Sequence, residues 1–386
     1  MNKRALHKLD KTILALIFCF SIYTPFLAGV IQDDKIVSSV EKRNLTKFPI
    51  PPKSLKSLRE YPENFNDYYS DHFGYREKFV KEYFKIINKF GVKKSVDDVT
   101  IGQEGWLFLG NIKAGYKRHN DPIGDAMNVN LFTEYQLKEF AKAIMDIKDW
   151  LGNRGINYIY VIAPNKHTIY SEYLPRHISK KNNKSSTDQL VEYLQEHTDV
   201  NVLDLRQALL DEKKKHPVYF KTDTHWNMYG ANVAQFELMK KIKPFFPKLI
   251  HPFLFPDHQF KIFPKGGGDL GGFANIENIK EDNPQPIFQA GCSPVNETPD
   301  NNGRKTHTVV CDAQELNAVI FRDSFFSALQ PYISRQFRRS TYIWEKINYN
   351  SLTKYVQQEN PDIIIDEVIE RSLPYIPSND LFDDAK

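Results

Sequence analysis

Cysteine is scarce in this sequence. There are three cysteines in 386 residues, and no two of them are spaced as Cys-x-x-Cys. Zinc and thiol-redox motifs usually need that spacing, so we expect neither here. His72, His225 and the aspartates are possible metal ligands by type, but no spacing supports a site, and we expect no metal and no cofactor. Cys19 lies in an apolar N-terminal stretch. Cys292 and Cys311 are the remaining pair, and in an exported protein they could either form a disulfide across a short loop or stay as buried thiols.

An excess of one charge is also missing. The net charge is +4, from 52 basic and 48 acidic residues, and no run of five like charges occurs. A nucleic-acid-binding protein needs a basic patch, so we expect no nucleic-acid partner. The chain does have 13% aromatic residues. Aromatic rings can stack on sugars, but a large core gives the same count.

The N-terminal region contains an uncharged stretch, residues 12–32. As a helix it would be ~30 Å long, which is enough to cross a bilayer. Basic residues precede it and Asp33 and Asp34 follow it, so the positive-inside rule places the N-terminus in the cytoplasm. We therefore predict a single-pass inner-membrane protein, with a cytoplasmic tail at 1–11 and a catalytic domain in the periplasm. The alternative is a cleaved signal peptide, although its cleavage site would be poor.

The rest of the chain divides into a linker and helical segment, 33–98, and one domain, 99–386. In this domain strands alternate with helices. Thr133 and Gln136 form a capping box before an apolar helix that ends at Gly152. Short apolar strands are expected at Ile156–Ala163, 202–205, 318–321 and 362–365, and helices at 187–197 and 228–241. This pattern predicts an α/β fold with a mostly parallel sheet flanked by helices. Residues of about 255–308 are rich in Gly, Pro and Asn, and we expect a loop-rich insertion there.

One group of candidate catalytic residues lies at Asp223-Thr224-His225-Trp226-Asn227. In an extended segment Asp223 and His225 project to the same side, so the carboxylate can orient the imidazole ring. The alternative is that both residues only cap the helix that starts near Asn227. By itself this motif does not decide between the two.

A second candidate is Ser324, which follows the strand 318–321 within Arg322-Asp323-Ser324. Open α/β sheets place their active sites at the carboxyl ends of parallel strands. Backbone N–H groups at the turn could also stabilise an oxyanion. The alternative is an ordinary helix N-cap. Together, Ser324, His225 and Asp223 supply the nucleophile, the base and the orienting acid that acyl transfer needs.

The chain also resembles a known family, the SGNH-hydrolase-like proteins of alginate O-acetylation, which overlap with the Asp-His-His-Trp family. The residues that carry the resemblance occur in the family's order: Asp71-His72-Phe73-Gly74-Tyr75-Arg76, Gly102, Gly105-Trp106-Leu107-Phe108, Pro164-Asn165-Lys166, Asp223-Thr224-His225-Trp226, Gly268-Asp269-Leu270, Asp323-Ser324-Phe325 and Glu370-Arg371.

The resemblance implies an SGNH-like fold with a catalytic group formed by Asp223, His225 and Ser324. It implies O-acetylation of an exopolysaccharide in the periplasm. The partners it implies are the polysaccharide acceptor and a multi-spanning membrane acyltransferase that delivers acetyl. Two alternatives remain, a carbohydrate O-acetylesterase and a non-catalytic polysaccharide-binding scaffold of an export complex.

Four further residues are candidates for binding substrate. Lys166 and His167 follow a predicted strand, and Arg371 follows another. Arg322 stands where the resembled family usually has glycine. Its side chain could crowd the oxyanion region or bind an anionic group, and the first possibility keeps the scaffold hypothesis open.

Overall fold

The computed structural model describes residues 18–21, 23–25, 27–29, 46–52, 55–76, 78–79, 99–110, 121–273, 280–288, 292–297 and 306–373. The chain divides into two units. The first comprises Met1–Lys94 with Lys113–Gly115 and Gly271–Glu277, and the second comprises Ser95–Ile112, Tyr116–Leu270 and Asn278–Lys386.

The main described element of the first unit is helix α2 (Leu55–His72). Near its end, Asp71 Oδ2 accepts hydrogen bonds from the backbone N–H and the hydroxyl of Thr46, each at 2.8 Å. These contacts hold residues 46–52 near the C-terminal part of α2.

The prediction of a single-pass inner-membrane protein is contradicted. Within the described residues, no helix combines the length and the apolar character that crossing a bilayer requires. In the predicted span 12–32, the structure describes only Phe18–Ser21, Tyr23–Pro25 and Leu27–Gly29. The other residues of that span lie outside the described part of the chain. The predicted location, a single pass through the inner membrane with the catalytic domain in the periplasm, is corrected on this finding.

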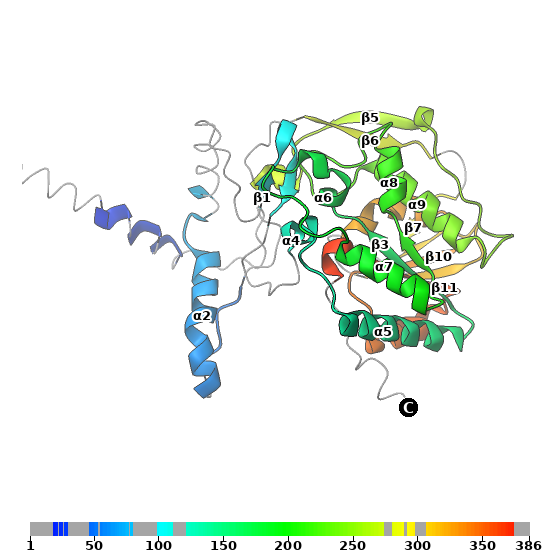
Figure 1. The fold of residues 1–386 in the computed structure, drawn as a ribbon, viewed down its shortest axis with the longest axis horizontal. Helices are drawn as coiled ribbons and strands as arrows, with labels where there is room; N and C mark the ends of the chain where they lie inside the picture. Colours follow the sequence, from blue (N-terminus) through cyan, green and yellow to red (C-terminus); the bar gives the residue numbers. More distant parts are fainter. Residues whose placement is uncertain are drawn as a thin grey trace, which may run out of the picture. The chain divides into compact units, whose positions relative to one another are not determined.

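The second unit is built on a seven-stranded sheet (Figure 1). Its strand order is β4 (Val202–Asp204), β3 (Asn157–Ala163), β11 (Ile363–Ile369), β9 (Asn317–Phe321), β10 (Arg339–Ile343), β8 (His307–Val310) and β7 (Val295–Asn296). The first five strands are parallel to one another, whereas β8 is antiparallel to β10 and β7 is antiparallel to β8. The sheet is therefore mixed, with its antiparallel pairs at one edge.

Alternate residues of the central strands enter two apolar layers, as the twofold side-chain period of a strand requires. In β3, Ile159 and Val161 face one layer, and Tyr158 and Tyr160 face the other. The first layer includes residues of α6 (Lys166–Ile169), α8 (Arg206–Glu212), α9 (Met228–Ile242) and α11 (Gln330–Ile333). The second includes residues of α5 (Glu134–Gly152), α7 (Ser186–His197) and α12 (Tyr349–Glu359), with α5 and α7 side by side (Figure 1). Burial on both faces explains why β3 and β9 are apolar along almost their whole length.

The local signals for these elements are confirmed. Thr133 and Gln136 form the predicted capping box of α5. The predicted strands correspond to β3, β4, β9 and β11, and the predicted helices to α7 and α9. β11 is longer than expected, however, because it continues through Asp366 and Glu367 to Ile369. Asp366 and Glu367 are both buried in β11. Because Asp and Glu are seldom buried, their presence in the sequence indicated the end of the strand, which was wrong.

The segment expected to be loop-rich contains regular structure. β5 (Phe260–Lys265) pairs antiparallel with β6 (Glu281–Pro286), and α10 (Asp269–Phe273) follows β5. Four of the six side chains of β5 are exposed. The ribbon therefore lacks the alternation of apolar and polar residues that identifies a half-buried strand, and Pro264 and Pro284 obscure it further. A second short hairpin joins β1 (Val99–Ile101) to β2 (Leu107–Leu109), and α4 (Pro122–Ala126) comes before α5.

Cys292 and Cys311 form a disulfide, with their Cα atoms 5.7 Å apart. The bond links two cysteines 19 positions apart, next to the edge strands β7 and β8. Of the two states that the sequence allowed, the structure has the paired one.

Removing this bond is expected to destabilise the protein, because closing a loop of this length restricts the unfolded chain. The double variant Cys292→Ser, Cys311→Ser should lower the free energy of unfolding by about 3 kcal/mol in urea denaturation. Wild type measured in a reducing agent should match the variant. A variant as stable as oxidised wild type would contradict the expectation.

A second prediction concerns Asp366, whose pKa burial raises to about 6 although Tyr158 donates to its Oδ2 at 2.8 Å. Between the ordinary carboxyl pKa and about 6, the folded protein binds more protons than the unfolded chain. This group therefore stabilises the fold at low pH and loses that contribution as pH rises through about 6. Between pH 4 and pH 7, the free energy of unfolding of Asp366→Asn should fall by about 2 kcal/mol less than that of wild type. Asp149→Asn, at an exposed carboxyl, is the control and should leave the slope unchanged.

Candidate active site

His225 lies in the loop between α8 and α9, two residues before the N-cap of α9. That cap is Asn227, whose Oδ1 accepts the N–H groups of Tyr229 and Gly230. The helix start is thus capped without the side chains of Asp223 or His225. The explanation of both residues as simple caps is therefore wrong.

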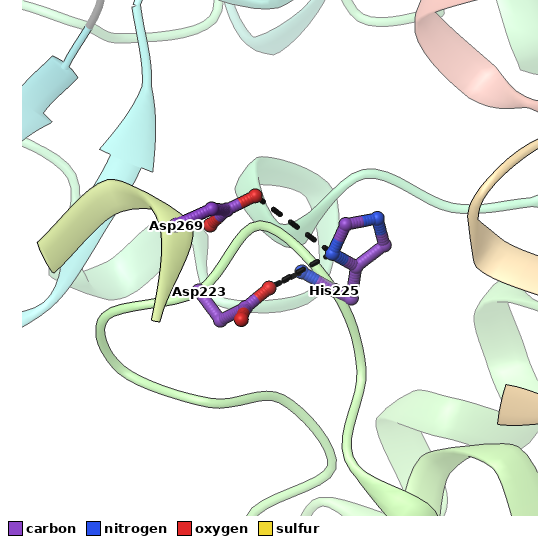
Figure 2. A group of neighbouring side chains, drawn as sticks. All are labelled: Asp223, His225 and Asp269. Atoms are coloured by element: carbon purple, nitrogen blue, oxygen red, sulfur yellow. Dashed lines mark hydrogen bonds and ion pairs between the residues drawn. The ribbon is translucent and has the colours of Figure 1, made fainter. Parts of the chain in front are cut away.

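Both nitrogens of the His225 ring are engaged. Nδ1 lies 2.8 Å from Asp223 Oδ1, and Nε2 lies 2.8 Å from Ser324 Oγ. In Figure 2 the carboxylate lies on the Nδ1 side of the ring and Nε2 points the other way. Because an ionised carboxylate can only accept, Nδ1 carries the proton and Nε2 presents a lone pair to the serine hydroxyl. The structure thus brings together the three residues that the sequence proposed as catalytic.

The protonation state of Asp223 suits this arrangement. Burial alone would raise the pKa of its carboxyl, but the hydrogen bond from His225 and the positive charge of Lys265 hold this pKa well below its ordinary value. Asp223 therefore stays ionised across the neutral range. Its side chain is 13% exposed and that of His225 is 31% exposed, so solutes can reach the imidazole while the acid beneath it is shielded.

Ser324 is held at a turn directly after β9. The carboxylate of Asp323 accepts the N–H of Phe325 at Oδ1 and the N–H of Ile369 at Oδ2, both at 2.8 Å. The turn is thereby tied to the end of β11, the neighbouring strand. On the other side, Trp226 Nε1 donates to Phe325 O at 3.0 Å, which joins the histidine loop to the serine turn.

Two of the four predicted substrate-binding residues are packed inside the unit. Lys166 is 2% exposed, and its ammonium donates to the carbonyls of Phe220, Lys221 and Asp223 at 2.7–3.1 Å. These bonds shape the loop that carries Asp223, so Lys166 supports the site from below. His167 is also buried, and its Nε2 donates to Leu109 O at 2.9 Å. Burial lowers the pKa of His167 to about 3, so its ring is neutral.

The two arginines differ in their surroundings. Arg322 is buried, stacks 4.0 Å from the centroid of the Trp344 ring, and donates to Asp323 O and Ser327 Oγ. This packing gives Arg322 a structural role in the serine turn. The guanidinium of Arg371 lies 5.4 Å from the centroid of the Phe325 ring, and Phe325 directly follows Ser324 in the sequence. Arg371 also donates to Asn165 Oδ1. Burial lowers the pKa of Arg371, but an arginine side chain stays charged even then.

Asn165, which the sequence offers only within the motif Pro164-Asn165-Lys166, contacts Arg371 and Glu370 in the structure. Its Oδ1 accepts from Arg371, its N–H donates to Glu370 Oε2 at 2.8 Å, and its Nδ2 is a buried donor with no partner among the described residues. An asparagine directly after a strand and a proline was the available signal, but turn chemistry produces the same pattern.

Asp269 is a second carboxylate beside the histidine. Figure 2 shows its carboxylate on the Nδ1 side of the ring. Asp269 Oδ2 lies 3.8 Å from His225 Nδ1, and Oδ1 accepts the N–H of Thr224 at 2.7 Å. Asp223, His225 and Asp269 are ligand types that a divalent cation could use, with ligand atoms within 4.8 Å of one another. However, the Lys265 ammonium lies 3.0 Å from Asp223 Oδ2 and His225 Nδ1 already donates to Asp223. These contacts fit an acid–imidazole pair better than a metal site.

Comparison with known proteins supports the resemblance noted in the sequence. Residues 99–339 match the family model described as "SGNH hydrolase-like domain, acetyltransferase AlgX". The chain is 30% identical over 141 residues to a probable alginate O-acetylase AlgJ of Pseudomonas putida, covering 35% of this chain and 31% of that protein. It is 26% identical over 169 residues to a probable alginate O-acetylase AlgJ of Azotobacter vinelandii, covering 40% of each.

The matched part therefore spans about a third of the first of these relatives and two-fifths of the second. Among solved structures, Bacillus cereus PatB1 aligns with a TM-score of 0.48 and 17% identity, over 72% of this chain and 97% of that one. The family model covers more than half of the chain and includes Asp223, His225 and Ser324. The chain therefore belongs to the family of SGNH hydrolase-like domains of AlgX-type acetyltransferases, and its second unit has their SGNH-like α/β fold.

Proposed function

We propose that this protein is an O-acetyltransferase that transfers acetyl to a hydroxyl of an exopolysaccharide through an acetyl-enzyme on Ser324. The observation that carries the proposal is the bridge made by His225, with Nδ1 on Asp223 and Nε2 on Ser324, each at 2.8 Å. Membership of the acetyltransferase family and the names of the matched relatives support the type of group transferred.

In the first half-reaction, Ser324 Oγ attacks the carbonyl carbon of an acetyl donor while its proton passes to His225 Nε2. The imidazolium that forms keeps its Nδ1–H on Asp223, whose low pKa keeps it a carboxylate. The bond between the acetyl carbon and the donor then breaks, and the departing group takes the proton from Nε2.

The tetrahedral intermediate carries a negative oxygen that needs a donor. The N–H of Phe325 is committed to Asp323 Oδ1, so it is a poor candidate. Asn165 Nδ2 has no partner among the described residues, and its side chain is bonded to Arg371, which lies 5.4 Å from the centroid of the Phe325 ring. These contacts support Asn165 as the donor and the guanidinium of Arg371 as a source of positive charge. A good oxyanion donor lowers the barrier by about 3–4 kcal/mol.

In the second half-reaction, a sugar hydroxyl gives its proton to His225 Nε2 and attacks the acetyl carbon. The new ester forms as the bond to Ser324 Oγ breaks, and Oγ recovers a proton from the imidazolium. The partners in this proposal are the polysaccharide acceptor and a multi-spanning membrane acyltransferase that supplies acetyl. No cofactor takes part in these steps.

A carbohydrate O-acetylesterase is the second candidate. The 31% exposure of the His225 side chain favours it, because water can then reach the base and replace the sugar as acceptor. The non-catalytic scaffold is less favoured. The scaffold hypothesis depends on Arg322 crowding the oxyanion region beside Ser324. In the structure the guanidinium of Arg322 stacks on the Trp344 ring instead.

Replacing the nucleophile tests the chemistry. With the full chain and p-nitrophenyl acetate, Ser324→Ala and His225→Gln should each reduce kcat/KM by at least about 10³-fold, because neither variant can form the acetyl-enzyme by assisted attack. The double variant should lose no more than the single ones, since the two groups act as a unit.

Ser179→Ala, at an exposed serine of the same unit, is the matched control and should keep full activity. Circular dichroism would check that the variants are folded. Equal rates for wild type and Ser324→Ala would exclude the serine mechanism and favour the scaffold.

The fate of the acetyl group separates the two enzymatic candidates. Wild type given the same ester and an alginate oligosaccharide should produce an oligosaccharide heavier by one acetyl group, detected by mass spectrometry. Free acetate alone, at a rate unaffected by the oligosaccharide, would identify an esterase and contradict the transferase.

A further inference from the structure

The acid side of the His225 ring is covered by a segment from the predicted insertion. β5 ends at Lys265, and α10 begins at Asp269. Lys265 Nζ lies 3.0 Å from Asp223 Oδ2. Asp269 Oδ2 lies 3.8 Å from His225 Nδ1, and Figure 2 draws the Asp269 and His225 side chains. The segment therefore adds one positive and one negative charge to a site that already holds an acid–imidazole pair.

Both added charges are held in place. Asp269 Oδ1 accepts the N–H groups of Thr224 and Leu270, each at 2.7 Å, which fixes its second oxygen near the imidazole. The Lys265 ammonium lies 3.7 Å from the centroid of the Phe220 ring. Between the two, Gly268 approaches Asp223 so closely that a Cβ there would lie 2.3 Å from the Cβ of Asp223. Only glycine permits this approach.

The other charged groups around the imidazole come from separate elements. Lys166 of α6 donates to the carbonyl of Asp223 at 2.7 Å. Arg371 follows β11 and lies against Phe325, whose ring centroid is 4.9 Å from that of His225. On the serine side the His225 ring faces the neutral hydroxyl of Ser324. Of these charges, only Asp223 and Asp269 form ion-pair contacts with the ring, and Lys265 acts through Asp223.

We propose that Lys265 and Asp269 are positioning residues with opposite effects on the proton affinity of His225. The proposal rests on the catalytic role given to His225 above. Asp269 stabilises the imidazolium by adding a second negative charge at Nδ1. Lys265 opposes it by compensating the charge of Asp223 and by holding that carboxylate in the orientation that receives Nδ1–H.

The balance matters because the base must be neutral before the attack and protonated after it. With both carboxylates uncompensated, the imidazolium would persist to higher pH and the base would be unavailable. Without Asp269, the imidazolium formed in the reaction would be less stable. An opposite charge within about 4–6 Å is enough to move such an equilibrium measurably.

The test is a titration of the His225 ring by NMR in the full-length, histidine-labelled protein. The chain has 11 histidines, so the His225 signal is assigned by its loss in His225→Gln. Lys265→Met should raise the pH midpoint of protonation by about 0.5–1 unit, and Asp269→Asn should lower it by a similar amount. Lys265→Arg keeps the charge and should stay near wild type. The acid limb of kcat/KM for the chromogenic ester should move in the same directions.

Matched controls lie on the same ribbon. Lys261→Met on β5 and Asp282→Asn on β6 change charge at exposed positions and should leave the midpoint within about 0.2 units of wild type. Shifts of Lys265→Met and Asp269→Asn in the same direction, or none in either, would overturn the proposal. Because the NMR midpoint needs no turnover, opposite shifts in a protein without ester activity would uphold this inference and reject the catalytic function instead.

Discussion

The site depends on one interaction, the engagement of both nitrogens of a single imidazole, Nδ1 by the nearby Asp223 and Nε2 by a serine from a distant part of the chain. His225 and Ser324 are 99 positions apart, yet their Nε2 and Oγ atoms lie 2.8 Å from each other. For this distance to persist, the loop before α9 and the turn after β9 must keep a fixed separation. Much of the described polar architecture of the second unit has this effect, from the cap of α9 to the ammonium of Lys166 beneath the Asp223 loop.

Two acidic groups at the carboxyl ends of the parallel strands, the half-buried Asp323 and the buried Glu367, fix the serine turn. Asp323 accepts N–H groups from its own turn and from β11, and Glu367 accepts the N–H of Asp323 at 3.0 Å. Burial and the charge of Asp323 raise the pKa of Glu367 well above its ordinary value. Such groups are costly to bury, and here backbone donors left over at strand ends offset that cost. The site therefore lies where backbone N–H groups at the strand ends donate to side chains and not to a neighbouring strand.

The sequence predicted well where the physical signal is local. A capping box, a strand buried on both faces and an Asx cap each depend on a few neighbouring residues, and α5, β9 and the N-cap of α9 were all expected. The failures involve tertiary context. The exposed β5–β6 ribbon has no apolar period, and β11 continues through acidic residues that distant partners such as Tyr158 make tolerable. The membrane span was predicted from apolarity alone, and no described helix supports it.

By itself, the sequence determined which residue types could form an acid–base–nucleophile group and that two of them share one extended segment. It also determined the α/β alternation, because strand and helix periods are written into consecutive residues. Only the tertiary structure decided that Lys166 is buried beneath the site and that Arg322 turns toward Trp344. It also decided that Lys265 contacts Asp223 and that Asp269 lies beside the imidazole. The physical reason is that a side chain's direction and charge environment depend on neighbours supplied by the fold, which are far away in the sequence.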